Sequence, residues 1–329
     1  MTRWALGLFA LVLSATPVLA QTLSAPGRNT LIIRGKKQHI HCFPPKGPRL
    51  DRRILYAPGD GGWRGWAIPV AESMATWGYD VCGLDTKTYL DGFHGTTKLT
   101  EADVMNDLHE VAEWMTQGSG ERVTLVGWSA GAGLGVLAAS GNGSKQAFSG
   151  LVVFGLGDEN LLAWHWWDTI ISLVKKPRER VFLAADYLAS VTPLPFYMIQ
   201  AGHDEYTPLD EANRLFAVAR DPKRFVLVPA RNHRFDGGRD EFFRALREGL
   251  RWIDGLTSLE EDVPVAAGDQ GGHVGQNARQ AQSSRIRQVV RLPDRIELLL
   301  VGAQPLEVVD RVAVLVEKGA NAVPEWRDR

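Results

Sequence analysis

The sequence predicts a doubly wound α/β domain, in which a mostly parallel sheet is covered by helices on both faces. Short apolar runs alternate with segments of helical spacing from about residue 53 to about residue 255. The runs are continuously apolar, which is typical of parallel strands buried on both sides. The chain has 329 residues, 45% of them hydrophobic, and is therefore long enough to bury a core of this size.

The expected elements follow from these patterns in chain order. A hairpin turns at Gly35, and repeated strand–helix units begin after a proline-rich turn at 44–48. The segment 157–193 interrupts the alternation and predicts a short cap-like insertion. We expect strands at 31–34, 38–43, 53–57, 79–84, 123–126, 151–155, 195–200 and 224–228, and helices at 66–77, 101–115, 130–140, 210–219 and 239–253.

The two ends of the chain differ from the domain between them. Residues 1–20 have a basic start, an apolar stretch and a small-residue ending before Gln21, which is the pattern of a cleaved secretory signal. We therefore expect a periplasmic or secreted protein with its main domain at 21–255. Residues 256–288 are polar and rich in small residues, which predicts a flexible linker, and residues 289–329 form a tail of unknown role.

Charge and cysteine content limit the partners and leave one question open. The net charge of −1 gives no indication of a nucleic-acid partner. The chain has two cysteines, Cys42 and Cys82, which an oxidising compartment would permit to pair. They could equally be two buried thiols, and the sequence does not decide between these states.

The stretch 122–135, RVTLVGWSAGAGLG, joins a buried strand to a helix through Ser129. Gly127 and Gly131 complete a G-x-S-x-G pattern, which predicts a tight turn that lifts the serine Oγ above the sheet. The N–H of Ala130, at the helix start, would then point toward a developing oxyanion. A glycine-rich turn with a capping serine would give the same five residues, so the rest of the chain must decide.

A serine nucleophile needs a histidine base and an acid that orients the histidine. Asp204 follows the expected strand at 195–200, and His233 follows the strand at 224–228. Parallel strands bring their carboxyl ends to one edge of the sheet, where such folds bind ligands. We therefore predict Ser129 as nucleophile, His233 as base and Asp204 as orienting acid.

Three neighbouring residues compete for these roles. His203 adjoins Asp204 and lies on the wrong loop for a base that must contact both partners. Glu205 and Asp210 follow too closely to be excluded as the acid, although Asp210 looks more like a first-turn helix carboxylate.

A second glycine-rich loop, GDGGW at 59–63, follows the strand at 53–57. Its small residues would let backbone N–H groups approach a substrate, so we expect the second oxyanion donor at Asp60, with Gly61 next. No Lys-Ser or Lys-Thr pair follows the glycines, which excludes a P-loop.

The GDGGW loop, the GWSAG elbow and the downstream Asp204 and His233 resemble the AcvB/VirJ family of bacterial periplasmic α/β hydrolases, over about residues 55–252. This resemblance implies an α/β-hydrolase fold and an exported serine hydrolase that releases lysine from lysyl-phosphatidylglycerol. Trp128 departs from the tyrosine usual at that point of the family's elbow.

Aromatic residues are expected to border the site. We predict substrate contacts from Trp63, Trp66 and Trp128, and an aromatic segment at 161–167 beside them. Basic residues follow in the insertion and would favour peripheral contact with an anionic membrane surface. These are Lys175, Lys176, Arg178 and Arg180. Inward-facing tryptophans and a solvated basic turn are the alternative.

These observations together predict an enzyme that cleaves a carboxylic ester through an acyl-enzyme, with no metal or organic cofactor. The family resemblance implies that the ester belongs to an aminoacyl-phospholipid. A peptidase or a carbohydrate esterase would use the same residues. A non-catalytic, secretion-associated binding protein is the alternative from another class, but such a protein has no need for a serine, a histidine and an acid on three separate loops.

Overall fold

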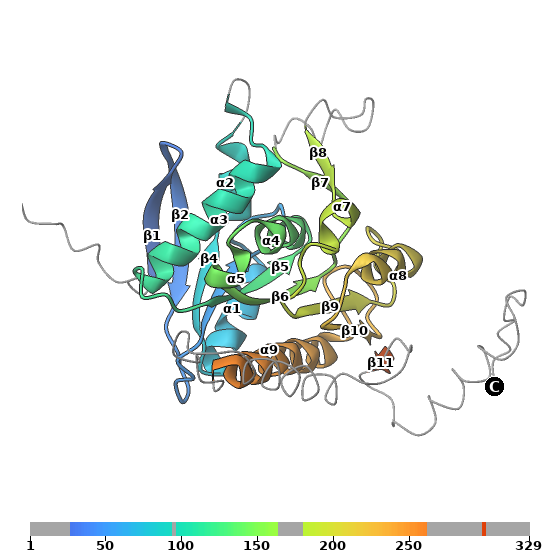
Figure 1. Cartoon of the computed structure of the whole chain (residues 1–329). Helices are drawn as coiled ribbons and strands as arrows, with labels where there is room; N and C mark the ends of the chain where they lie inside the picture. The colour runs from blue at the N-terminus through green and yellow to red at the C-terminus, as the bar shows by residue number, and fades with distance from the viewer. Residues whose placement is uncertain (1–26, 94–96, 164–179, 262–297, 301–329) are drawn as a thin grey trace, which may run out of the picture.

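The computed structural model describes residues 27–93, 97–163, 180–261 and 298–300 (Figure 1). Its strands are β1 (Gly27–Ile33), β2 (Lys36–Phe43), β3 (Arg53–Ala57), β4 (Asp80–Leu84), β5 (Val123–Trp128), β6 (Phe148–Phe154), β7 (Glu159–Leu161), β8 (Val181–Leu183), β9 (Phe196–Ala201), β10 (Lys223–Val228) and β11 (Leu298–Leu300). Its helices are α1 (Ala67–Thr76), α2 (Thr86–Asp91), α3 (Glu101–Thr116), α4 (Ala130–Ser140), α5 (Ser144–Ala147), α7 (Ala185–Leu188), α8 (Leu209–Val218) and α9 (Arg239–Glu261).

The described strands form one large sheet in the order β1-β2-β4-β3-β5-β6-β9-β10-β11. The pairs β1–β2 and β2–β4 are antiparallel, and every later pair is parallel. Strands β5, β6, β9 and β10 therefore all end at the same edge. The predicted doubly wound, mostly parallel sheet is confirmed.

Helices cover both faces of this sheet (Figure 1). Helices α3, α4 and α8 pack on one face through a cluster that includes Leu108, Leu134 and Leu215. Helices α1 and α9 pack on the other face through a second cluster, with Val70 and Leu246 among its fully buried members. The sheet lies between two apolar layers, which explains why its strands are apolar on both sides.

A disulfide joins Cys42 of β2 to Cys82 of β4, with an S–S distance of 2.08 Å. The two cysteines are direct partners across the antiparallel pair, and both are buried. The register of β2 against β4 thus places the two cysteines where they can pair, a choice that the sequence alone did not make.

The structure corrects one expected boundary and adds elements in the insertion and the tail. The linker prediction is wrong for residues 256–261, because α9 continues to Glu261; buried Thr257 extends its apolar stripe, and the Thr257 hydroxyl donates to the Ile253 carbonyl at 3.0 Å. The insertion contributes a two-stranded antiparallel sheet, β7–β8. Within the tail, β11 pairs in parallel with β10. No described helix combines the length and apolarity needed to span a bilayer.

Candidate active site

Ser129 sits on a strained turn between β5 and α4. Its backbone has φ 54° and ψ −121°, a conformation that non-glycine residues rarely adopt. The turn is tight because a Cβ at Gly131 would lie 2.0 Å from the carbonyl oxygen of Ala57, a contact that only glycine avoids. The Ser129 N–H donates to the carbonyl of Phe154 at 3.0 Å, which fastens the turn to β6. The structure thus has the tight strand-to-helix turn that the G-x-S-x-G pattern predicts.

Asp204 and His233 are joined directly. Asp204 Oδ2 lies 2.8 Å from Nδ1 of His233, and the two residues come from the loops after β9 and β10. The Asp204 side chain has no exposed surface, and that of His233 is 7% exposed. The hydrogen bond at Nδ1 leaves Nε2 as the ring nitrogen available for proton transfer.

Asp204 is held in its ionised form. Burial alone would raise its pKa, but the hydrogen bond and charge of His233 and backbone hydrogen bonds from Thr207 and Tyr206 outweigh burial and lower the pKa. The two backbone N–H groups reach Oδ1 at 3.0 and 2.9 Å. The carboxylate therefore keeps the negative charge that a protonated imidazole would need beside it.

Ser129 and His233 both lie against the end of β6, at Phe154 and at Gly155, the residue after it. Ser129 is bonded to Phe154, and the His233 ring lies over Gly155, where an added Cβ would come within 2.4 Å of Cε1. Nε2 of His233 is buried and has no hydrogen-bond partner among the described residues, Ser129 included. Catalytic hydrogen bonds of this kind are often long without substrate and shorten in the reacting complex.

The glycine-rich loop passes directly beside the serine. A Cβ at Gly59 would lie 3.3 Å from Ser129 Cβ and 3.8 Å from its Oγ. Asp60 and Gly61 follow within a turn closed by the Gly62 N–H on the Gly59 carbonyl at 2.9 Å. On the other side, Ala130 begins α4, and the first N–H groups of a helix have no acceptor within it. Both expected sources of oxyanion donors thus flank Ser129.

The three tryptophans predicted to contact substrate have different surroundings. Trp128 stacks on the His233 ring, with centroids 5.7 Å apart. Trp63 instead lies flat on His41 at 4.7 Å. Trp66 packs against α9, where its ring is 5.5 Å from that of Phe242. Only Trp128 of the three has a described contact with a predicted catalytic residue, while Trp63 and Trp66 contribute to packing.

The three residues that competed for the roles of base and acid have other contacts in the structure. Glu205 binds the backbone N–H of His233 at 2.8 Å, away from the imidazole. Asp210 pairs with Arg214 on α8 at 3.2 Å. His203 is exposed, and its backbone N–H donates to the Ala230 carbonyl.

Two features of the site escaped sequence reasoning. Tyr206 is 73% exposed and meets the His233 ring edge-on, with centroids 5.2 Å apart. The Arg64 side chain lies over the glycine loop, its Nε 3.8 Å from the position of a Cβ on Gly61. Arg64 follows the GDGGW loop and Tyr206 lies two residues after Asp204, and these positions in the sequence could have pointed to both residues. The direction of a loop side chain, however, depends on tertiary contacts.

Much of the expected cap lies outside the described residues. The aromatic residues Trp164, Trp166 and Trp167 belong to that part, as do Lys175, Lys176 and Arg178. Arg180 is described, and its guanidinium pairs with Glu101 of α3 at 2.8 Å. Arg180, the last of the four basic residues, therefore forms an ion pair within the domain.

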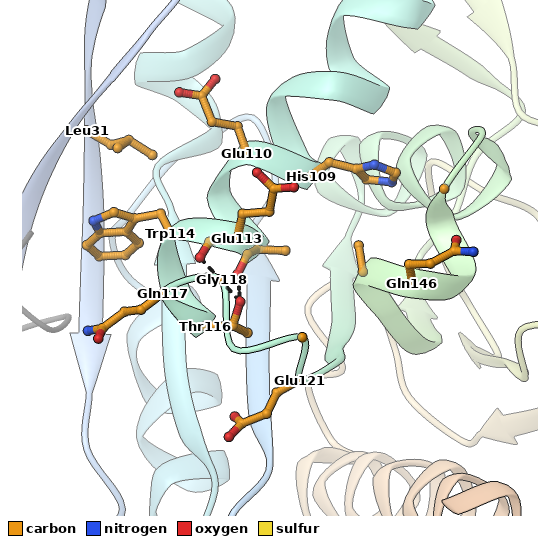
Figure 2. A pocket seen from close by; sticks show the side chains of 14 residues that line it. Leu31, His109, Glu110, Glu113, Trp114, Thr116, Gln117, Gly118, Glu121 and Gln146 are labelled. Carbon is orange, nitrogen blue, oxygen red and sulfur yellow. Dashed lines mark hydrogen bonds between the residues drawn. The ribbon is translucent and has the colours of Figure 1, made fainter. Parts of the chain in front are cut away.

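A separate hollow of about 1080 Å³ lies between β1, the end of α3 and α5 (Figure 2). Glu110, Glu113 and Trp114 line it, together with His109, whose pKa is lowered by burial. None of the predicted catalytic residues takes part, so this hollow is distinct from the candidate site. In the described parts of the chain, no group of three or more His, Cys, Asp or Glu side chains is placed to hold a metal ion.

Comparison with known proteins supports the family resemblance over residues 51–146, which include the GDGGW loop and Ser129 but not Asp204 or His233. Residues 51–146 match the family model described as bacterial virulence protein (VirJ). The chain is 24% identical over 189 residues to YfhR, an uncharacterized protein of Escherichia coli O157:H7. That alignment covers 55% of this chain, which spans 62% of the length of YfhR.

Solved structures share the architecture at low identity. GrgF, an α/β hydrolase from Penicillium sp. sh18, aligns with a TM-score of 0.54 and 10% identity, covering 70% of this chain and 99% of its own. Est1E from Butyrivibrio proteoclasticus aligns with a TM-score of 0.52 and 16% identity, covering 70% and 99%. The chain is thus VirJ-like over residues 51–146, and its described domain has the α/β-hydrolase fold.

Proposed function

We propose that this protein is a serine hydrolase that cleaves a carboxylic ester through an acyl-enzyme. The observation that carries the proposal is the meeting, at one sheet edge, of Ser129 on its strained elbow and the hydrogen-bonded Asp204–His233 pair. A glycine-rich loop and a helix N-terminus flank the serine, as stabilisation of an oxyanion requires.

The reaction proceeds in two halves. Nε2 of His233 takes the Ser129 proton while Oγ attacks the ester carbonyl carbon, and the carbonyl electron pair moves onto oxygen. The N–H groups of Ala130 and of Asp60 or Gly61 bind that oxyanion. The carbonyl re-forms, and the alcohol leaves with the proton from His233, which leaves an acyl-Ser129. A water deprotonated by His233 then attacks the acyl carbon, and the acid is released as Ser129 regains its proton.

Asp204 acts on the histidine throughout these steps. Its hydrogen bond at Nδ1 keeps Nε2 directed toward the serine, and its charge stabilises the imidazolium in each half. Because the pKa of Asp204 is lowered, the carboxylate is ionised wherever His233 functions as a base.

Pre-steady-state turnover of p-nitrophenyl esters tests this function. We expect a burst of nitrophenol equivalent to the enzyme concentration, followed by slower turnover, because an acyl-enzyme accumulates when deacylation is the slower step. The proposal would be contradicted if the protein hydrolysed none of these activated esters, with short or long acyl chains, faster than they hydrolyse in buffer alone.

The substrate class is an ester on an anionic lipid, such as an aminoacylated phosphatidylglycerol. The resemblance of the GDGGW loop and the GWSAG elbow to the AcvB/VirJ family implies this class, and two exposed side chains beside the site support it. Tyr206 offers an aromatic surface suited to a membrane interface. Arg64 supplies a cation next to the glycine loop, within reach of a phosphate.

Vesicle assays separate this substrate from soluble esters. Wild-type protein should cleave aminoacyl-phosphatidylglycerol faster in anionic than in neutral vesicles, and Arg64→Gln should raise KM for the lipid without changing KM for a neutral soluble ester. Lys145→Gln is the matched control, since Lys145 is exposed on α5, before the amino end of β6. If Arg64→Gln and Lys145→Gln have the same KM for the lipid, Arg64 does not recognise the lipid, and the protein is a general esterase.

Export is the remaining part of the proposal. The disulfide supports an oxidising compartment, where such bonds persist. The mature chain should begin at Gln21 and be recovered from the periplasm or the medium. N-terminal sequencing that finds Met1 in a cytoplasmic fraction would refute export and leave the hydrolase proposal standing.

A further inference from the structure

We infer that Glu205 is a positioning residue, whose carboxylate holds the backbone of His233 so that the imidazole keeps its place beside Ser129. The inference rests on the proposed hydrolase function. It assigns to Glu205 a role that differs from that of the orienting acid, although the two carboxylates are neighbours in the chain.

Adjacent carboxylates hold His233 at two points. Asp204 Oδ2 lies 2.8 Å from the ring at Nδ1, and Glu205 Oε2 accepts the backbone N–H of His233 at 2.8 Å. The bond at Nδ1 and the rings that pack on the imidazole act on the side chain of His233. The bond from Glu205 acts on its backbone, so that the ring and the main chain are both tied to one loop.

The loop that carries both carboxylates is itself anchored. Gln200 is fully buried at the end of β9, and its Nε2 donates to the Thr207 carbonyl at 2.8 Å. Thr207 and Tyr206 donate their N–H groups to Asp204 Oδ1. The turn 204–207 is therefore closed on itself and tied to the sheet, so that Glu205 starts from a defined backbone position.

The histidine loop needs such a contact because it contains strained backbone. Phe235, two residues after His233, has φ 58°, in the left-handed region that disfavours bulky side chains. The His203 N–H also donates to the Ala230 carbonyl at 3.1 Å, which joins the two loops before the histidine. At His233 itself, the Glu205 carboxylate accepts the hydrogen bond of the backbone N–H.

Two substitutions at Glu205 separate the acceptor from its charge. Glu205→Ala removes the acceptor, whereas Glu205→Gln keeps an oxygen at the same reach and removes only the charge. Asp210→Ala is the matched control, because it removes one exposed carboxylate nearby that pairs with Arg214 and does not contact His233. The assay measures kcat and KM on a soluble ester, thermal unfolding, and hydrogen exchange of the His233 amide by NMR.

We expect Glu205→Ala to lower kcat by about 10-fold to 100-fold with KM within about twofold of wild type, which corresponds to the loss of one hydrogen bond to a charged group. Glu205→Gln should restore kcat to within about threefold, and Asp210→Ala should match wild type. Exchange of the His233 amide should be faster in Glu205→Ala than in Glu205→Gln.

Other outcomes overturn the inference. Unchanged kcat in Glu205→Ala would show that the contact positions nothing. Equal losses in the Ala and Gln variants would assign the effect to charge, and a rise in KM alone would assign Glu205 to substrate binding. If wild-type protein hydrolyses no ester, the proposed function fails, and amide exchange still reports whether Glu205 holds His233.

Discussion

Gly155 gives a direct test of how closely the histidine is packed against the sheet. Its φ is +60°, and a Cβ added there would lie 2.4 Å from Cε1 and 2.9 Å from Nδ1 of His233. Ordinary van der Waals contact of a Cβ begins at 3.4 Å, so the ring must retreat by about 1 Å in Gly155→Ala. A misplacement of about 1 Å can cost about 100-fold in rate. We therefore expect kcat to fall by about 100-fold.

The chain offers a matched control for the backbone strain. Gly35 has φ +74°, and a Cβ there would meet nothing within 4 Å. Gly35→Ala should therefore lose roughly 1 to 2 kcal/mol of stability from the left-handed conformation. Gly155→Ala should lose this amount and the further cost of displacing the buried ring, and only Gly155→Ala should lose activity. Steady-state kinetics on a soluble ester and urea unfolding measure the two effects. Activity of Gly155→Ala within threefold of Gly35→Ala would refute the predicted packing.

Three further predictions concern the acid and the disulfide. Asp204→Asn should lower kcat about 10⁴-fold, because the amide no longer selects the productive imidazole tautomer; a loss below tenfold would exclude Asp204 as the orienting acid. The pKa of Asp204 is lowered in the folded state, so its stabilising contribution is present above the ordinary carboxyl pKa and is lost as pH falls through the folded value. Urea unfolding of wild type should accordingly lose more stability below about pH 4 than that of Asp204→Asn, and parallel curves would contradict this. Replacing both Cys42 and Cys82 by Ala should cost about 4 kcal/mol, from a bridge with a sequence separation of 40; equal unfolding midpoints of the variant and the oxidised wild type would be inconsistent with the bridge.

The fold and the order of the candidate catalytic residues were predictable because both depend on local patterns. Apolar strands of this length are recognisable one at a time, and parallel strands must bring their carboxyl ends together. The placement of Ser129, Asp204 and His233 at one edge follows from that rule alone. The Asp204–His233 bond is the geometry that this reasoning anticipates.

The remaining features depend on contacts between distant segments. The disulfide requires the register of β2 against β4, which neither cysteine's neighbours specify. Trp66 follows the glycine loop in sequence, but Phe242 and Phe243 of α9 draw its ring into the packing. Tyr206 points outward over His233 because the turn around Asp204 sets its direction. A glycine beneath the histidine ring, such as Gly155, becomes meaningful only once β6 and the loop after β10 are side by side.

Labelling with a fluorophosphonate probe, read by intact mass, tests the central proposal most directly. Such probes react with a serine only when a base has activated it, so heat-denatured protein serves as the control for non-specific reaction. We predict one adduct per chain on native wild-type protein, located at Ser129 by peptide mapping, and none on Ser129→Ala, whose thermal stability should be nearly unchanged. An adduct that persists on Ser129→Ala, or native wild-type protein that takes up no more probe than the denatured control, would contradict the assignment of Ser129 as the nucleophile.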